Sequence, residues 1–197
     1  METQVNPPPA GADSPHPPNA YEPLHLGDRI DLEQNTENRF SVSMLPIDIF
    51  DSWDRCGDIA DFVASYFQYS FRSANSKGII STVVNELIEN AVKYSRNKSS
   101  AIQLEVRKRQ EHLLLRVSNL IPRNQRDHFA AICRDLFQRD LEELYVEKLT
   151  RAQKDRTFSG IGLILLKKDY EALLGMDIVT DSGDLIRVDV TVDLAVT

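Results

Sequence analysis

Hydrophobic and polar residues recur along this chain with two different periods, and each period predicts a type of element. Apolar residues spaced three and four apart predict two amphipathic helices. The first helix would carry Trp53, Cys56, Ala60, Val63 and Phe67, and the second Ile80, Val83, Val84, Leu87, Ile88 and Ala91. Asn75 or Ser76 can cap the second helix, which we expect to end near Ser95 and Asn97.

Apolar residues at every second position predict strands instead. Strands are expected at residues 40–44, 102–106, 113–117, 176–180 and 185–194, and further helices at residues 126–153 and 160–174. The order of elements is therefore β-α-α-β-β-α-α-β-β. Helices grouped between antiparallel hairpins predict an α+β fold of two layers, in which helices cover one face of a mostly antiparallel sheet.

The N-terminal segment differs in composition from the rest of the chain. Seven of the nine prolines precede residue 24, and residues 1–37 contain seven acidic residues and one basic residue. Such a segment gathers too little apolar surface to offset the entropy lost on ordering, so we expect residues 1–37 to be a disordered, Pro-rich acidic leader. Docking of a partner is the alternative to a solvated leader. Residues 38–197 then form one domain.

Composition excludes several classes of function. The 22 Lys and Arg residues after residue 37 are interleaved with 23 Asp and Glu residues, whereas nucleic-acid binders cluster their basic residues. Cys56 and Cys133 lack the spacing of a zinc site or a disulfide framework, and we expect both to pack as small apolar side chains. The start of the chain lacks the features of a secretory signal, and no apolar run reaches the roughly 20 residues that cross a bilayer. We therefore expect a cytoplasmic protein without nucleic acid or membrane as a partner.

The second predicted helix carries the most informative polar residues. Glu86 and Asn90 are four positions apart and share one face, which Lys93 and Tyr94 continue. A carboxylate can orient or deprotonate a nucleophile, and an amide oxygen can ligate Mg²⁺ beside nucleotide phosphates. An amphipathic helix that simply exposes Glu and Asn to solvent is the alternative interpretation.

A glycine-containing loop could supply the phosphate site that this chemistry needs. Residues 159–163 read Ser-Gly-Ile-Gly-Leu, and glycines let backbone N–H groups approach a phosphate at the start of the following helix. A glycine turn that serves only tight helix packing is the alternative.

Together the two segments resemble the motifs of a known family. Residues 85–95 resemble the N box of the GHKL, or Bergerat-fold, ATPases, and residues 159–166 resemble their second glycine box, in the family's order. The resemblance extends over about residues 38–194. It implies the histidine-kinase-like ATPase fold, with ATP and Mg²⁺ as ligands and a helical lid at about residues 124–158. A solvated helical hairpin is the alternative for that last segment.

The resemblance also assigns roles to individual residues. Glu86 would be the catalytic glutamate of the anti-sigma-factor kinases, Asn90 the Mg²⁺-ligating asparagine, and Lys93 a residue near phosphate. The second glycine box would bind the nucleotide through Gly160, Ile161, Gly162 and Leu163.

The first glycine box departs from the family pattern. The family reads Asp-x-Gly-x-Gly after a strand, and the matching residues 119–123 here read Asn-Leu-Ile-Pro-Arg. Asn119 keeps one acceptor oxygen for the adenine amino group but lacks the charge of Asp. Both glycines are missing as well, so the sequence predicts nucleotide binding that is weakened, slow or absent.

Within the GHKL class the chain is most similar to the bacterial serine/threonine kinases of partner-switching systems, including the SiaB-like kinases. None of the four histidines lies in a dimerisation helix with a His-Glu motif, which disfavours a sensor histidine kinase. The resemblance implies transfer of the ATP γ-phosphate to a small regulatory protein of antagonist or sigma-factor type, with a homodimer as a further expectation. Two alternatives stay open: an inactive GHKL-fold protein that acts as an interaction module, and a domain with neither nucleotide nor regulatory partner.

Overall fold

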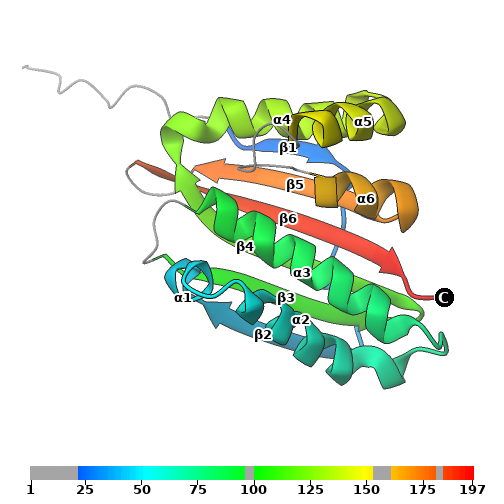
Figure 1. The fold of residues 1–197 in the computed structure, drawn as a ribbon. Coiled ribbons are helices and arrows are strands. Elements are labelled where there is room, and N and C mark those ends of the chain that lie inside the picture. Colours follow the sequence, from blue (N-terminus) through cyan, green and yellow to red (C-terminus); the bar gives the residue numbers. More distant parts are fainter. Residues whose placement is uncertain (1–21, 96–99, 153–160, 181–183) are drawn as a thin grey trace, which may run out of the picture.

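The protein forms a six-stranded antiparallel sheet whose helices lie on one face (Figure 1). The computed structural model describes residues 22–95, 100–152, 161–180 and 184–197. The strands are β1 (Leu24–Gly27), β2 (Asn38–Met44), β3 (Ile102–Arg109), β4 (His112–Pro122), β5 (Leu173–Thr180) and β6 (Leu185–Ala195). Their order across the sheet is β1-β5-β6-β4-β3-β2. The fold is thus the predicted α+β sandwich of two layers.

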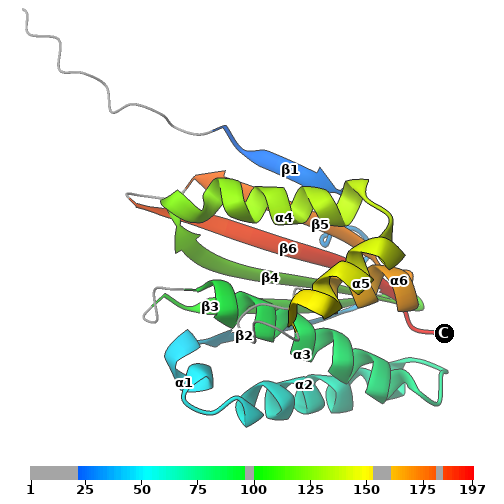
Figure 2. The same cartoon turned by 45° about the horizontal axis from the view of Figure 1, so that its top comes forward.

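The helices form two groups over the sheet (Figure 2). They are α1 (Pro46–Phe50), α2 (Asp54–Phe67), α3 (Ser76–Tyr94), α4 (Arg126–Gln138), α5 (Leu141–Ala152) and α6 (Ile161–Asp169), with 3₁₀ turns at Gln68–Ser70 and Arg123–Gln125. Helices α1, α2 and α3 lie over the β2 side, and α4, α5 and α6 lie over the β1 and β5 side. Among the described helices, none is long and apolar enough to cross a membrane.

The periodicities that predicted the elements also form the core. Helix α3 buries Val83, Val84, Leu87, Ile88 and Ala91, and the inward residues of β4 are Leu113, Leu115 and Val117. Cys56 and Cys133 are buried free thiols, as expected. Burial raises the pKa of Cys56 to about 11, with the charge of Glu89 adding to the effect, and burial raises the pKa of Cys133 to about 12.

Three predicted boundaries need correction. Residues 46–50 form α1, where the sequence indicated only a break at Pro46. The expected helix at residues 126–153 is two helices, which separate at Arg139, whose backbone is extended. The helix expected to reach residue 174 ends at Asp169, because Glu171 adopts a left-handed backbone conformation and Leu173 begins β5.

The N-terminal segment is a larger correction. Residues 1–21 lie outside the described residues, but residues 22–37 are not a disordered leader. Strand β1 pairs with β5, from Leu24 opposite Ile178 to Gly27 opposite Gly175. The chain then crosses from one edge of the sheet to the other, since β2 lies at the opposite edge. We call this crossing segment, residues 28–37, the strap.

The strap runs over the face of the sheet that the helices leave bare, as the thin trace behind β5 and β6 in Figure 1 shows. Both guanidinium Nη atoms of Arg107 donate to Glu33, at 2.5 and 2.8 Å. Lys108 donates to Glu37 at 2.7 Å. Leu32 is completely buried, although it lies outside the main core. Composition missed the strap because its partners are strand residues more than 70 positions away.

The burial of Leu32 yields a stability prediction. Leu32→Ala should lower the free energy of unfolding by about 2–4 kcal/mol, because it leaves a cavity under the strap. Leu149→Ala on α5 is the matched control, since Leu149 is 41% exposed and should cost well under 1 kcal/mol. Urea unfolding followed by circular dichroism measures both. Equal effects of the two changes would show that the strap is not packed in solution.

Candidate functional site

Two polar residues of α3, Glu86 and Asn90, face the start of α6 and the helices above it. Burial of Leu87, Ile88 and Ala91 against the sheet fixes the rotation of α3 about its axis. Glu86 and Asn90 are therefore turned to the side on which α6 and the α4–α5 pair lie. We call α4 and α5 the lid, since they cover this side of the site.

Glu86 lies directly against Gly162, the second residue of α6. A Cβ atom on Gly162 would overlap the Oε2 atom of Glu86, so only glycine leaves room for this carboxylate. The position also places a negative charge at the N-terminus of a helix, where unpaired N–H groups and the helix dipole favour it. The structure thus brings together Glu86 of the N box and Gly162 of the glycine loop.

Two carboxylates one turn apart on α3 have opposite electrostatic environments. Burial, and next the charge of Glu89, raises the pKa of Glu86, and Lys93 opposes this only in part. Burial would also raise the pKa of Glu89. Hydrogen bonds from Lys93 and Asn85, both 2.9 Å long, outweigh burial and hold the pKa of Glu89 below its ordinary range. Glu86 is therefore the better proton acceptor near neutral pH, and Glu89 stays ionised.

Lys93 does not point at the glycine loop. Its ammonium bonds Glu89 and lies 6.0 Å from the centre of the Trp53 ring, on the side of α3 that faces α1 and α2. The predicted phosphate contact of Lys93 would require this ion pair to break.

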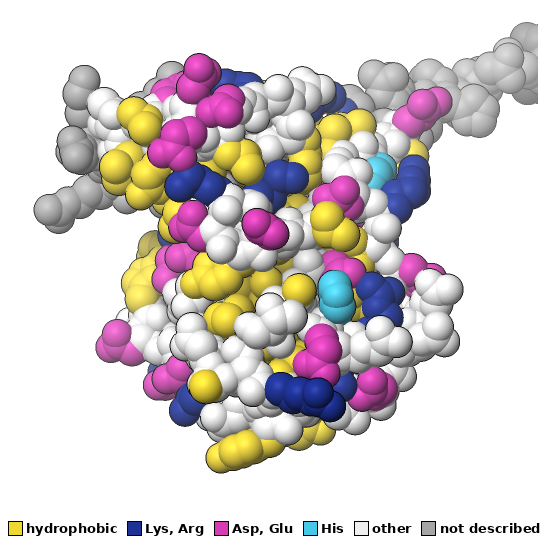
Figure 3. Space-filling model, turned by 90° about the vertical axis from the view of Figure 1, so that its right-hand side faces the viewer, with side chains coloured by type: hydrophobic (Ala, Val, Ile, Leu, Met, Phe, Trp, Pro, Cys, Tyr) yellow, Lys and Arg dark blue, Asp and Glu magenta, His cyan; other side chains and the backbone are white. Residues whose placement is uncertain are grey.

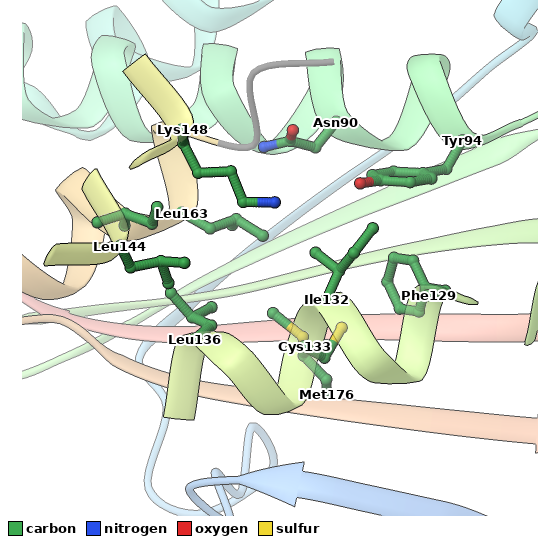
Figure 4. A pocket seen from close by; sticks show the side chains of 11 residues that line it. Asn90, Tyr94, Phe129, Ile132, Cys133, Leu136, Leu144, Lys148, Leu163 and Met176 are labelled. Carbon is green, nitrogen blue, oxygen red and sulfur yellow. The ribbon is translucent and has the colours of Figure 1, made fainter. Parts of the chain in front are cut away.

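Asn90 borders two small cavities between α3, the lid and the sheet. One cavity, of about 30 Å³, is lined mainly by lid residues, and the other, of about 20 Å³, reaches Asn119 on β4. Asn90, Tyr94, Phe129 and Leu163 line both, so the two are neighbours. The Nδ2 atom of Asn90 is buried and finds no hydrogen-bond partner among the described residues. Figure 4 shows this nitrogen directed into the space under the lid.

The cavity walls are mostly apolar. Tyr94 and Phe129 meet edge to face, with ring centres 5.1 Å apart, and Leu136 and Leu144 of the lid close the space from the other side. Burial raises the pKa of Tyr94 to about 12, so its hydroxyl stays protonated. An ion pair of 3.1 Å joins Glu142 of the lid to Lys168 of α6, and one of 2.8 Å between Arg139 and Glu147 holds α5 against the end of α4. The lid therefore packs on the sheet as a closed cover.

Asn119 lies inside the protein at the end of the smaller cavity. Its amide nitrogen donates to the Ser95 hydroxyl at 3.1 Å and to the Ala91 carbonyl at 3.4 Å, which joins β4 to the end of α3. The residues after it do not form the glycine-type loop of the family. Instead β4 continues to Pro122, paired with β6 up to Leu185. With Ile121 buried, this segment is a rigid strand end.

The residues at one end of the site fit a Mg²⁺-nucleotide. The Asn90 Nδ2 atom is buried without a partner among the described residues, and a half-turn of the amide would present the Oδ1 atom to Mg²⁺ in its place. The described residues include no cluster of three or more His, Cys, Asp or Glu that could hold a metal alone, so phosphate oxygens would complete the ligand set. The closed cavities are far smaller than the roughly 300 Å³ or more of a ligand site, so binding requires the lid to open.

Not every predicted site residue lies in one place. Glu86, Asn90, Gly162 and Leu163 come together, and Asn119 lies at the far end of the smaller cavity. Ile161 begins α6 beside them, whereas Gly160 and the end of the predicted lid, residues 153–158, lie outside the described residues. Sequence reasoning missed Lys148, a lid residue that lines the larger cavity. A lysine among the alternating charges of α5 carries no sequence signal that sets it apart.

The molecular surface shows charges of both signs. In Figure 3 the Lys and Arg side chains are mixed with Asp and Glu, without a patch of one sign on the face shown. This view agrees with the interleaved charges in the sequence. The absence of a nucleic-acid partner remains a prediction.

Comparison with known proteins supports the fold. No protein-family model matches the sequence, and no curated protein matches it either. Among solved structures, the chain is similar to one chain of the crystal structure of the SiaB-SiaC complex from Pseudomonas aeruginosa, with a TM-score of 0.59 and 16% identity. The match covers 84% of this chain and 99% of that one. At this identity the likeness shows a shared fold, of the SiaB type.

The contact between Glu86 and Gly162 predicts a coupling that a double-mutant cycle can measure. Gly162→Ala should lower the free energy of unfolding by about 1–3 kcal/mol, because the new methyl group displaces the carboxylate. In a Glu86→Ala background the same change should cost almost nothing. Thermal unfolding of the four proteins gives the coupling free energy. An equal cost in both backgrounds would mean that the two side chains do not meet.

The two carboxylates predict opposite responses to pH. The raised pKa of Glu86 means that its protonated form stabilises the fold fully below the ordinary value of 4.5, and that this contribution is lost as the pH rises through the folded-state pKa. Glu86→Gln should therefore raise the melting temperature at pH 7. The gain should disappear near pH 4.

Glu89→Gln is the matched control with the opposite sign. Its lowered pKa means that ionised Glu89 stabilises the fold above the ordinary value of 4.5, and that this contribution is lost as the pH falls through the folded-state pKa. Glu89→Gln should lower the melting temperature at pH 7. If both variants shifted it in the same direction, the assigned environments would be wrong.

Proposed function

We propose that this chain is an ATP-binding regulatory protein that acts as a serine/threonine protein kinase in a bacterial partner-switching system. It would transfer the γ-phosphate of ATP to a hydroxyl group of a small partner protein in the cytoplasm. The observation that carries the proposal is the joint placement of Glu86 against Gly162 and of the buried, unpartnered Asn90 amide one turn away. A purely structural helix face has no use for a buried amide nitrogen without a partner, because it costs stability.

Each residue has a distinct part in the proposed reaction. The Glu86 carboxylate accepts the proton of the partner's hydroxyl. The hydroxyl oxygen forms a bond to the γ-phosphorus while the bond between that phosphorus and ADP breaks. Burial supports this role, because the raised pKa strengthens Glu86 as a base. Asn90 would supply one oxygen ligand to Mg²⁺, which neutralises charge on the phosphate oxygens when bound. The N-terminus of α6 orients the phosphates through backbone N–H groups.

A protein as phosphate acceptor is supported by the structural neighbour, which is part of a complex of SiaB with SiaC. The shared fold does not carry the activity, so the acceptor stays part of the proposal. A hydroxyl that approaches Glu86 must come from outside the lid, which suits a side chain on a separate protein better than a small molecule enclosed in the cavity.

One observation favours a second candidate function, a protein-interaction module without turnover. Strand β4 is paired up to Pro122, where the family has a glycine loop, and the cavities are small and mostly apolar. If the lid stays closed, the fold can act only through its surface. Nucleotide binding separates the two candidates.

Calorimetric titration of the full chain with Mg²⁺-ATP tests the proposed function. We expect a Kd in the micromolar range for the unchanged protein and at least about tenfold weaker binding for Asn90→Ala. Asn85→Ala is the matched control, since this asparagine bonds Glu89 on a neighbouring face of α3 and should leave affinity nearly unchanged. Absence of binding at millimolar nucleotide would overturn the kinase proposal in favour of the interaction module.

Basal ATP hydrolysis then isolates the role of Glu86. Water replaces the partner's hydroxyl in this reaction, so Glu86→Gln should lower kcat by about 10²- to 10⁴-fold while Mg²⁺-ATP affinity stays near that of the unchanged protein. If kcat were unaffected, Glu86 would not be the base.

A further inference from the structure

The lid carries a lysine that faces the site from the side opposite α3. Lys148 lies in the last two turns of α5, is half-buried, and lines the larger cavity together with Asn90 and Leu163. Figure 4 shows its ammonium nitrogen directed over Leu163 toward the Asn90 amide. The side chain thus spans from the cover of the site to its centre.

Lys148 differs from three other cations near the site, each of which has an acidic partner. Lys168 pairs with Glu142, Arg139 with Glu147, and Lys93 with Glu89. For Lys148 the described part of the chain offers no ion pair or hydrogen bond. An anionic ligand would supply the partner that this cation lacks.

The surroundings of Lys148 are suited to an anion. The Nδ2 atom of Asn90 faces the same space and has no acceptor among the described residues. Helix α6, nine residues long, begins close by at Ile161 and turns the positive end of its dipole toward this region. The Lys148 ammonium and the Asn90 Nδ2 atom therefore face one space in which neither has an acceptor among the described residues, and phosphate oxygens are acceptors of matching charge.

We propose that Lys148 binds the phosphate chain of the nucleotide and couples closure of the lid to the presence of phosphates. This inference rests on the proposed function and adds the ligand contact that the sequence had assigned to Lys93. Lys93 is engaged with Glu89 and Trp53 on the other side of α3. Lys148 moves with the lid, so a nucleoside diphosphate or triphosphate draws α5 down on the site, whereas a nucleoside alone leaves this cation without a partner.

Calorimetry with phosphorylated and unphosphorylated ligands tests the assignment. The full chain is titrated with Mg²⁺-ATP, Mg²⁺-ADP and adenosine, as the unchanged protein and as Lys148→Met, Lys148→Arg, Lys93→Met and Lys77→Met. Lys148→Met should weaken both nucleotides about 10- to 100-fold and leave adenosine affinity unchanged, because one charged hydrogen bond is lost. Lys148→Arg should recover most of the affinity.

Lys93→Met tests the competing phosphate contact, and Lys77→Met is the control. Lys93→Met should change nucleotide affinity less than threefold, and Lys77→Met, on the exposed first turn of α3, should behave as the unchanged protein. The affinity of Lys148→Met for Mg²⁺-ATP should also depend less on salt concentration.

The outcomes separate this inference from the proposed function. Unchanged nucleotide affinity in Lys148→Met, or an equal loss for ATP and adenosine, would overturn the phosphate contact while the kinase proposal stands. A loss in Lys93→Met without one in Lys148→Met would return the contact to Lys93. Failure of the unchanged protein to bind any nucleotide would overturn both proposals.

Discussion

The packing of α3 against the sheet is the interaction on which the rest of the structure depends. Its apolar residues, among them Leu87, Ile88 and Ala91, pack against the inward side chains of the sheet and fix the helix in one rotation. That rotation turns Glu86 toward Gly162 and Asn90 toward the space under the lid. A helix with the same polar residues but another buried face would expose them to solvent, where neither would have unusual chemistry.

Two acidic residues on this helix differ because of their neighbours. Glu89 has Lys93 and Asn85 as hydrogen-bond donors, and its pKa is lowered. Burial and the nearby charge of Glu89 raise the pKa of Glu86. Such a separation of two similar groups is the usual way in which a site divides an ionised role from a proton-accepting role. The pair Lys93–Glu89 is thus better understood as part of the environment of Glu86 than as a ligand contact.

The closed lid and the strap cover opposite faces of the sheet, and different interactions attach them. The strap crosses the bare face and binds β3 through Glu33 and Glu37, with the Leu32 side chain buried. The lid packs through apolar residues and a few ion pairs over cavities that have room for little more than water. The strap and the lid lie on opposite faces of the sheet, so a movement of the lid would leave the strap contacts in place.

The sequence by itself determined most of the elements, the α+β class and the faces of α3, because periods of 3.6 and 2 are local properties that Leu87 and Ile88 or Leu113 and Leu115 express directly. It also placed Glu86, Asn90 and Gly162 in one candidate site through the resemblance of two motifs. Only the tertiary structure decided which partners charged residues take. Lys93 pairs with Glu89, Lys148 faces the cavity, Asn119 binds the end of α3, and the strap finds Arg107 and Lys108 on a distant strand. The physical reason is that the pairing of a charged residue leaves no periodic pattern in the sequence. Its partner is whichever residue the packing of the whole chain brings within a few ångströms.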